Sequence, residues 1–71
     1  MSEKIILGID PGTLHLGYGI ISVKKNVITT VCLGEVRLNK LENQQLKLLK
    51  IYEKLKALIL EYKPDECAVE C

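Results

Sequence analysis

The sequence is poor in cysteine and contains only Cys32, Cys67 and Cys71. An odd number of cysteines argues against a disulfide framework, and no charged segment followed by an apolar core, as in a secretory signal, opens the sequence. We therefore expect the protein to act in the reducing cytoplasm.

Long apolar runs and a strong net charge are also lacking. No run approaches the ~20 residues that a membrane-spanning helix needs, so we expect no membrane association. Ten Lys and Arg residues face nine Asp and Glu residues, for a formal net charge of +1. This balance neither favours nor excludes nucleic acid as a partner, because the distribution of the charges would have to decide.

What the sequence does contain suits one small globular domain. It has 71 residues, of which 48% are hydrophobic and 27% are charged, and this composition is not that of a disordered chain. A chain of this size buries only about 60% of its unfolded surface. Because the chain stops on the strand-like run Val69-Glu70-Cys71, we expect it to be the first part of a longer protein.

The order of the expected elements is β-β-β-α-β. Apolar, β-branched runs predict strands, and apolar residues at spacings of three and four predict one long helix. Pro64 ends this helix, and Lys63 before it is excluded from the helical region. The expected strands are residues 4–10, 16–24, 27–38 and 65–71, and the expected helix is residues 42–62.

Local signals refine this pattern. Lys24-Lys25-Asn26 predicts a hairpin turn, because asparagine tolerates a positive φ. Gly34 predicts a bulge in the third strand. The apolar face of the helix is expected to consist of Leu41, Leu48, Ile51, Tyr52, Leu55, Leu58, Ile59 and Tyr62.

The chain order predicts that two acidic residues meet. A right-handed crossover through the helix would return the fourth strand beside the first and parallel to it. Asp10 and Glu70 would then lie at the same end of the sheet. Side chains alternate along a strand, so Asp10 shares a face with Gly8, and Glu70 shares a face with Ala68. The small neighbours would leave space around both carboxylates.

Asp10 has two interpretations. Asp10-Pro11-Gly12 suits a β-turn, which is a purely structural role. A carboxylate at the end of a buried strand also suits a metal ligand, because burying a charge is costly unless something pairs with it. Mg²⁺ prefers oxygen ligands and typically takes one or two protein carboxylates. Two carboxylates are too few to hold a pair of divalent ions, so further acidic residues would be needed.

Three segments resemble the RuvC family of Holliday-junction resolvases. The first is Ile6-Leu7-Gly8-Ile9-Asp10-Pro11-Gly12-Thr13, followed by Gly17-Tyr18-Gly19-Ile20-Ile21. The second is Leu49-Lys50-Ile51-Tyr52-Glu53-Lys54-Leu55. The third is Tyr62-Lys63-Pro64-Asp65-Glu66-Cys67-Ala68-Val69-Glu70. The resemblance runs over nearly the whole chain, from residue 6 to residue 70, with the family's order and spacing. Leu16 and Cys71 depart from the family's usual residues.

The resemblance implies a ribonuclease H-like α/β fold, with residues 1–71 as the N-terminal part of a single nuclease domain. It implies a homodimeric endonuclease that requires Mg²⁺, with Mn²⁺ as a substitute, and resolves four-way DNA junctions with the RuvA and RuvB branch-migration proteins. Asp10 and Glu70 would be the first two of four acidic catalytic and metal-binding residues. The other two would lie in a C-terminal helix outside this chain, so the chain alone is expected to be inactive.

Two other functions remain open. A fragment of an actin-like ATPase would bind nucleotide phosphates through backbone N–H groups of the turn formed by residues 10–13. Pro11 lacks an N–H group, which counts against this alternative. No positive feature supports a non-enzymatic adaptor.

The remaining residues with polar or reactive side chains have no expected part in catalysis. His15 is expected to be a solvated loop residue. Cys67 and Cys71 are expected to be small buried apolar residues, because no further Cys or His completes a zinc site. Thr13 and Tyr18 lie near the expected site and are candidates for contact with the DNA backbone.

Two groups of residues are expected to play supporting roles. The glycines Gly17 and Gly19 are interpreted as structural, although glycine within a strand also indicates close approach of another group. A solvated basic face of the helix, which would be able to touch phosphates, is expected from Lys47, Lys50 and Lys54.

Overall fold

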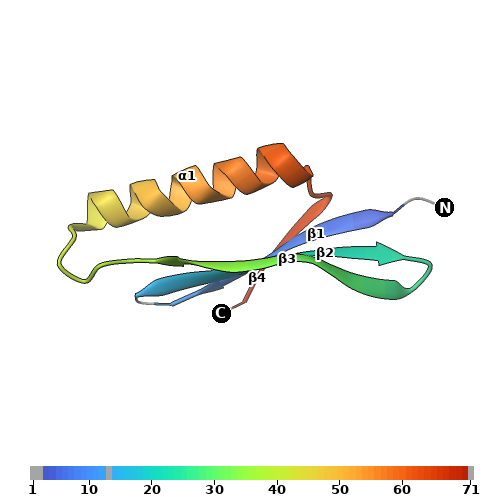
Figure 1. Ribbon diagram of the computed structural model, residues 1–71. Helices are drawn as coiled ribbons and strands as arrows, with labels where there is room; N and C mark the ends of the chain where they lie inside the picture. The colour runs from blue at the N-terminus through green and yellow to red at the C-terminus, as the bar shows by residue number, and fades with distance from the viewer. Residues whose placement is uncertain (1–2, 13, 71) are drawn as a thin grey trace.

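The computed structural model describes residues 3–12 and 14–70. It contains a four-stranded sheet and one helix, in the predicted order β-β-β-α-β (Figure 1). Every observed boundary lies within two residues of its predicted position. The elements are β1 (Lys4–Pro11), β2 (His15–Lys24), β3 (Val27–Arg37), α1 (Gln44–Tyr62) and β4 (Glu66–Val69).

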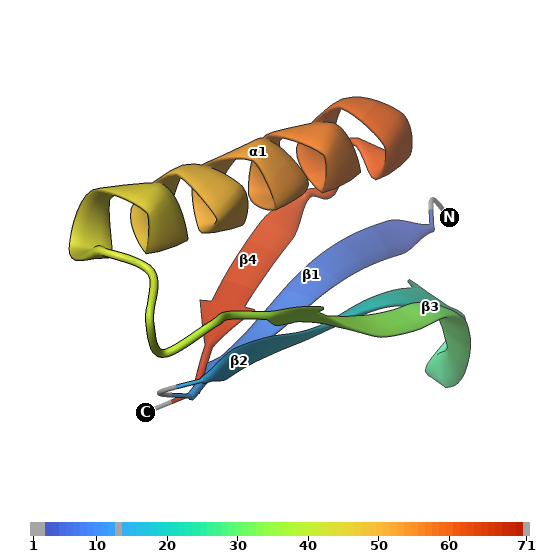
Figure 2. The ribbon, with the colours of Figure 1, turned by 60° about the vertical axis from the view of Figure 1, so that its left-hand side comes forward.

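The sheet has the strand order β3-β2-β1-β4. β1 pairs antiparallel with β2 and parallel with β4, so the predicted crossover is confirmed. Figure 2 shows α1 lying along one side of the sheet, and no described element covers the other side. In the described part of the chain, no helix combines the length and apolar character needed to cross a membrane.

A small core lies between α1 and the sheet. Its fully buried side chains are Leu7 of β1 and Ile20 of β2, and Leu58 of α1 is 4% exposed. Half-buried residues pack around them, among them Ile5 and Ile9 on the predicted face of β1. The uninterrupted apolar run of β1 predicts burial on both faces, but the described chain covers only the face toward α1.

The apolar face of α1 is narrower than predicted. Leu58 is buried, and Ile51, Leu55 and Tyr62 are half-buried. The prediction is wrong for Leu41, Leu48, Tyr52 and Ile59, which are 50–86% exposed. A single helix touches a sheet along one line of side chains, so residues at the margins of its apolar stripe stay in solvent.

Two turns match their sequence signals. Lys25 and Asn26 both adopt a positive φ, of 52° and 65°, which is the geometry of the tight hairpin turn that fits the twist of the flanking strands. At the end of α1, Lys63 adopts the left-handed conformation, with φ 47° and ψ 59°. It is thus outside the helical region, as Pro64 requires.

The predicted bulge at Gly34 is wrong. Gly34 pairs regularly with Tyr18, whereas the register of β2 and β3 shifts between Ile20 and Ile21 and leaves Val31 as the extra residue. Gly34 has a packing reason instead, because a Cβ atom there would clash with the Tyr18 hydroxyl. The glycine lets the tyrosine ring cross β3.

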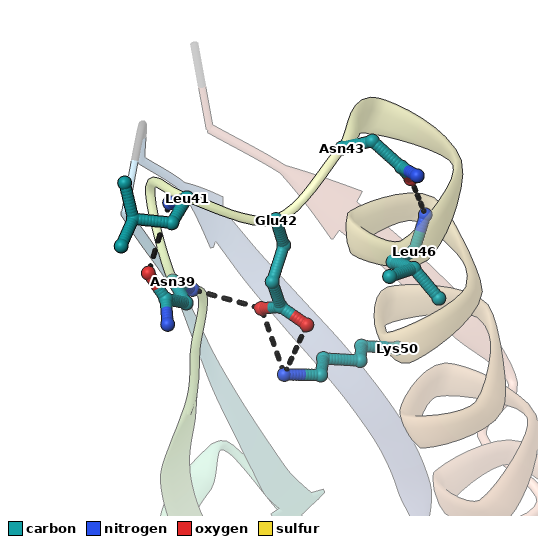
Figure 3. Close-up of polar contacts among 6 residues, drawn as sticks. All are labelled: Asn39, Leu41, Glu42, Asn43, Leu46 and Lys50. Carbon is teal, nitrogen blue, oxygen red and sulfur yellow. Dashed lines mark hydrogen bonds and ion pairs between the residues drawn. The ribbon is translucent and has the colours of Figure 1, made fainter.

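The start of α1 is held by two polar residues (Figure 3). The Asn43 side chain accepts a hydrogen bond of 2.8 Å from the Leu46 N–H, so the helix begins at Gln44 and not at the predicted Glu42. Glu42 instead accepts hydrogen bonds from Lys50 at 2.8 Å and from the Asn39 N–H at 3.0 Å. The hydrogen bond from Lys50 is the main cause that holds the pKa of Glu42 below its ordinary value.

This contact predicts a measurable acid dependence. Because the pKa of Glu42 is lowered in the folded state, its contribution to stability is present above the ordinary carboxyl pKa and is lost as the pH falls through the folded value. We expect Lys50→Met to raise the pKa of Glu42, measured by ¹³C NMR titration of the carboxylate. Lys56→Met is the control, because Lys56 lies over the Tyr52 ring and not beside Glu42. An unchanged pKa in Lys50→Met would contradict the assignment.

Candidate functional site

A groove of about 650 Å³ lies on the face of the sheet opposite α1. Its walls come from all four strands and from the residue that follows β4. The residues that line it are Ile6, Gly8, Ile9, Asp10, Gly17, Tyr18, Gly19, Ile21, Leu33, Gly34, Ala68, Val69 and Glu70. Both predicted acidic residues therefore border one groove.

The parallel pairing of β1 and β4 brings these two residues together. Ile9 is the register partner of Val69, and Asp10 and Glu70 are the next residues on the two strands. The Glu70 N–H donates a hydrogen bond of 2.9 Å to the Ile9 carbonyl, which extends the pairing beyond the end of β4. The predicted small neighbours, Gly8 and Ala68, are themselves register partners.

Glycines keep the floor of the groove open beside Asp10. Gly17 is the register partner of Asp10 on β2. A Cβ atom at Gly17 would meet only the Asp10 carbonyl oxygen at 3.7 Å and the Asp10 Cβ at 3.8 Å, which are ordinary contacts. At Gly19, by contrast, a Cβ would lie 3.0 Å from Leu33 Cδ2. The Leu33 atom is the end of a flexible side chain that is 75% exposed and has room to move. Neither position therefore requires a glycine for packing, and position 17 has the more open surroundings.

The predicted β-turn at Asp10-Pro11-Gly12 is wrong in its position, because Asp10 and Pro11 still pair with Gly17 and Leu16 of β2 and the chain turns only after Pro11. The Gly12 N–H donates a hydrogen bond of 2.8 Å to the His15 carbonyl. A Cβ at Gly12 would lie 2.7 Å from the same oxygen, so the turn needs a glycine. Thr13 lies outside the described residues. His15 is exposed as predicted, but it is the first residue of β2 and not part of a loop.

The carboxylates offer the hard oxygen atoms that Mg²⁺ prefers. Among residues 3–12 and 14–70, no group of three or more His, Cys, Asp or Glu side chains is placed to hold a metal ion. The chemistry of the two carboxylates suits a Mg²⁺ ion that keeps most of its water ligands.

Several residues considered for contact with DNA lie on the α1 side of the sheet, opposite the groove. The Lys54 ammonium lies 5.3 Å from the centre of the Tyr18 ring, and that ring packs against the core under α1. Lys50 is paired with Glu42. The prediction of a solvated basic face is confirmed for Lys50, which is exposed although it pairs with Glu42, and is wrong for Lys54, which is half-buried. Both side chains lie across the sheet from the groove.

Cys67 is exposed on β4, so the prediction of a buried thiol is wrong for this residue. The physical reason is the position of β4, an edge strand whose four residues are all exposed. Cys71 lies outside the described residues. The contacts of Asp65 and Glu66 with β1 were not predicted, because they depend on a strand register that a sequence pattern does not reveal.

Two solved structures share this fold. Both are titled as the Aquifex aeolicus PPX-GPPA enzyme or family member, with a TM-score of 0.76. Each matches 96% of this chain and 26% of its own chain, at 14% and 15% sequence identity. At such low identity the likeness concerns the fold alone, an α/β arrangement built on a mixed sheet.

Sequence comparison identifies a much nearer group of relatives. The curated protein "Crossover junction endodeoxyribonuclease RuvC" of Cytophaga hutchinsonii is 46% identical over 68 residues, which are 96% of this chain and 34% of that protein. The protein of the same name from Bacteroides fragilis is 44% identical over 70 residues, which are 99% of this chain and 37% of that protein. The chain thus spans little more than a third of the length of these relatives.

The family model described as "Crossover junction endodeoxyribonuclease RuvC" matches residues 6–71. This range includes both groove carboxylates, β1 from Ile6 onward and the other three strands. The predicted ribonuclease H-like α/β fold is confirmed by the strand order and by this match. The chain belongs to the RuvC family.

Proposed function

We propose that this chain supplies the first half of the acidic active site of a magnesium-dependent, structure-specific endonuclease. Its substrate would be a four-way (Holliday) DNA junction, and its reaction the hydrolysis of phosphodiester bonds in recombination and repair. The observation that carries the proposal is the pairing of β1 with β4, because it brings Asp10 and Glu70 to one groove. Membership of the RuvC family supports it.

Each carboxylate would have a distinct position in this site. Asp10 comes from β1, which has a strand on each side, and Glu70 approaches from the edge strand β4. Both would act as metal ligands and catalytic residues. A bound Mg²⁺ ion would polarise the phosphoryl oxygen and lower the pKa of a bound water. The open backbone at Gly17 would leave room for the phosphodiester chain beside Asp10.

Other parts of the proposal concern the whole protein. Residues 1–71 would form the N-terminal part of a single nuclease domain and would be inactive alone, because two carboxylates do not complete a two-metal site. The remaining acidic residues would come from a C-terminal helix. The enzyme would be a cytoplasmic homodimer that acts with RuvA and RuvB, and Mn²⁺ would replace Mg²⁺.

The structure weakens the alternative of a nucleotide-binding ATPase. A phosphate-binding turn needs free backbone N–H groups. Pro11 has none, and the Gly12 N–H is already bonded to the His15 carbonyl at 2.8 Å. Neither Pro11 nor Gly12 therefore has a free N–H group to offer a phosphate.

The deciding experiment compares DNA substrates in the whole protein. We expect Mg²⁺-dependent cleavage of a synthetic four-way junction, and at least ~10-fold slower cleavage of a linear duplex with the same arm sequences. The control is an ATP titration by calorimetry, which we expect to show no saturable binding. Equal cleavage of both substrates would contradict structure specificity, and saturable ATP binding without cleavage would favour the ATPase.

A further inference from the structure

β4 has little to hold it in register. It is the shortest strand, it lies at the edge of the sheet, and its four residues are all exposed. Its register nevertheless decides the position of Glu70, because a slip of one residue would turn that side chain to the α1 face. The strand therefore needs a feature outside its own side-chain packing to fix its register.

The residue just before β4 provides such a feature. The Asp65 N–H donates a hydrogen bond of 2.7 Å to the Ile5 carbonyl. In return, the Asp65 carboxylate accepts a hydrogen bond of 2.8 Å from the Ile5 N–H. Asp65 thus hydrogen-bonds both the backbone N–H and the backbone carbonyl of Ile5. A contact that uses both groups specifies one partner on β1 and excludes its neighbours.

A second contact follows immediately. The Lys4 ammonium lies 2.6 Å from the Glu66 carboxylate, and this pair raises the pKa of Lys4. About half of each side chain is exposed, so an ion pair of this kind contributes little stability. The bonds between Asp65 and Ile5 are therefore the stronger candidates for fixing the register.

We propose that Asp65 is a positioning residue for the acidic site: its two hydrogen bonds to Ile5 set the register of β4 on β1 and thereby hold Glu70 beside Asp10. The role in metal binding rests on the proposed function, whereas the role in register does not. Asp65 fixes the start of β4 in this way. At the other end of the strand, the Glu70 N–H donates a hydrogen bond of 2.9 Å to the Ile9 carbonyl.

The test compares Asp65→Ala with Asp65→Asn in the whole protein. Asp65→Ala removes the acceptor for the Ile5 N–H, and Asp65→Asn keeps an acceptor oxygen. The first readout, without metal, is the hydrogen-exchange rate of the Glu70 amide divided by that of the Ile20 amide. We expect a rise of about tenfold in Asp65→Ala and a near-normal ratio in Asp65→Asn. The second readout is the Kd for Mn²⁺, which we expect to rise about tenfold in Asp65→Ala.

Two controls separate positioning from general destabilisation. Glu53→Ala removes the same charge from α1 and should change neither readout. Leu58→Ala opens a cavity in the core beside Ile20 and should lower the Tm and speed exchange of the Ile20 amide. The exchange ratio should therefore not rise, and the Mn²⁺ Kd of the folded protein should stay unchanged. If Leu58→Ala raises the Kd as much as Asp65→Ala does, Asp65 is merely structural and the proposal is overturned.

The outcomes also separate this proposal from the proposed function. Unchanged exchange and unchanged Mn²⁺ Kd in Asp65→Ala, with Mn²⁺ binding abolished in Asp10→Asn, would overturn the role of Asp65 and leave the nuclease site standing. Unchanged Mn²⁺ binding in Asp10→Asn would overturn the metal site instead. The exchange ratio of the Glu70 amide would then still decide whether Asp65 sets the register.

Discussion

Asp10→Asn is expected to lower the rate of junction cleavage by the whole protein by about a thousandfold, which corresponds to ~4 kcal/mol of transition-state stabilisation. The substitution keeps the size of the side chain and replaces a charged metal ligand by a neutral amide. Asp10 is exposed at the end of β1 and makes no contact with the core, so the fold should tolerate the change. Single-turnover cleavage at saturating enzyme measures the effect.

Junction binding should survive this substitution. Affinity for DNA comes largely from cationic contacts with phosphates, and Asp10→Asn removes none of these. A gel-shift assay in Ca²⁺ or EDTA should therefore show a Kd within about threefold of the unmodified protein. Glu35→Gln is a matched control, because this acidic residue pairs with Arg37 on β3 and is not in the predicted site. Full cleavage by Asp10→Asn would show that the central assignment is wrong.

The placement of Asp10 and Glu70 could be predicted from the sequence because it depends on two general rules. The period of two along a strand puts each carboxylate on the face of its small neighbour, and the right-handed crossover makes β4 parallel to β1. Neither rule depends on the details of packing. Both predicted features of the fold are observed, whereas the catalytic role of the two residues stays a prediction.

Features that depend on the pairing register between strands could not be predicted from the sequence. The bulge falls at Val31, a β-branched residue with no sequence signal, and its position sets which residue of β3 lies against Tyr18. A glycine in a strand predicts a bulge, but the role of Gly34 in the structure is to make room for the Tyr18 ring. The bonds of Asp65 with Ile5 have the same origin, because 60 positions separate the two residues. Burial of Cys67 failed as a prediction because alternation gives the face on which a side chain lies and does not reveal whether another element covers that face.

Gly17→Val is expected to give the second large effect, a loss of at least ~10-fold in kcat/KM for the junction without a loss of stability. A Cβ at this position makes only ordinary contacts, at 3.7 Å and 3.8 Å with Asp10, and the rest of the side chain would enter the groove. Glycine within a strand costs ~0.5–1 kcal/mol relative to alanine, and valine favours strands. The Tm should therefore stay unchanged or rise while cleavage falls.

Side chains of graded size at position 17 test this steric effect next to Asp10. Gly17→Ala should lower cleavage less than Gly17→Val, because one methyl group fills less of the space beside Asp10. Gly19→Ala is the matched control on the same face, since Gly19 pairs with Gly8 and lies farther from Asp10. Its effect on cleavage should be smaller than that of Gly17→Ala, although its contact with Leu33 is tighter. If Gly17→Val cleaves junctions at the normal rate, the substrate does not pass beside Asp10. The glycine at position 17 would then need another explanation, and the nuclease proposal would lose its steric support.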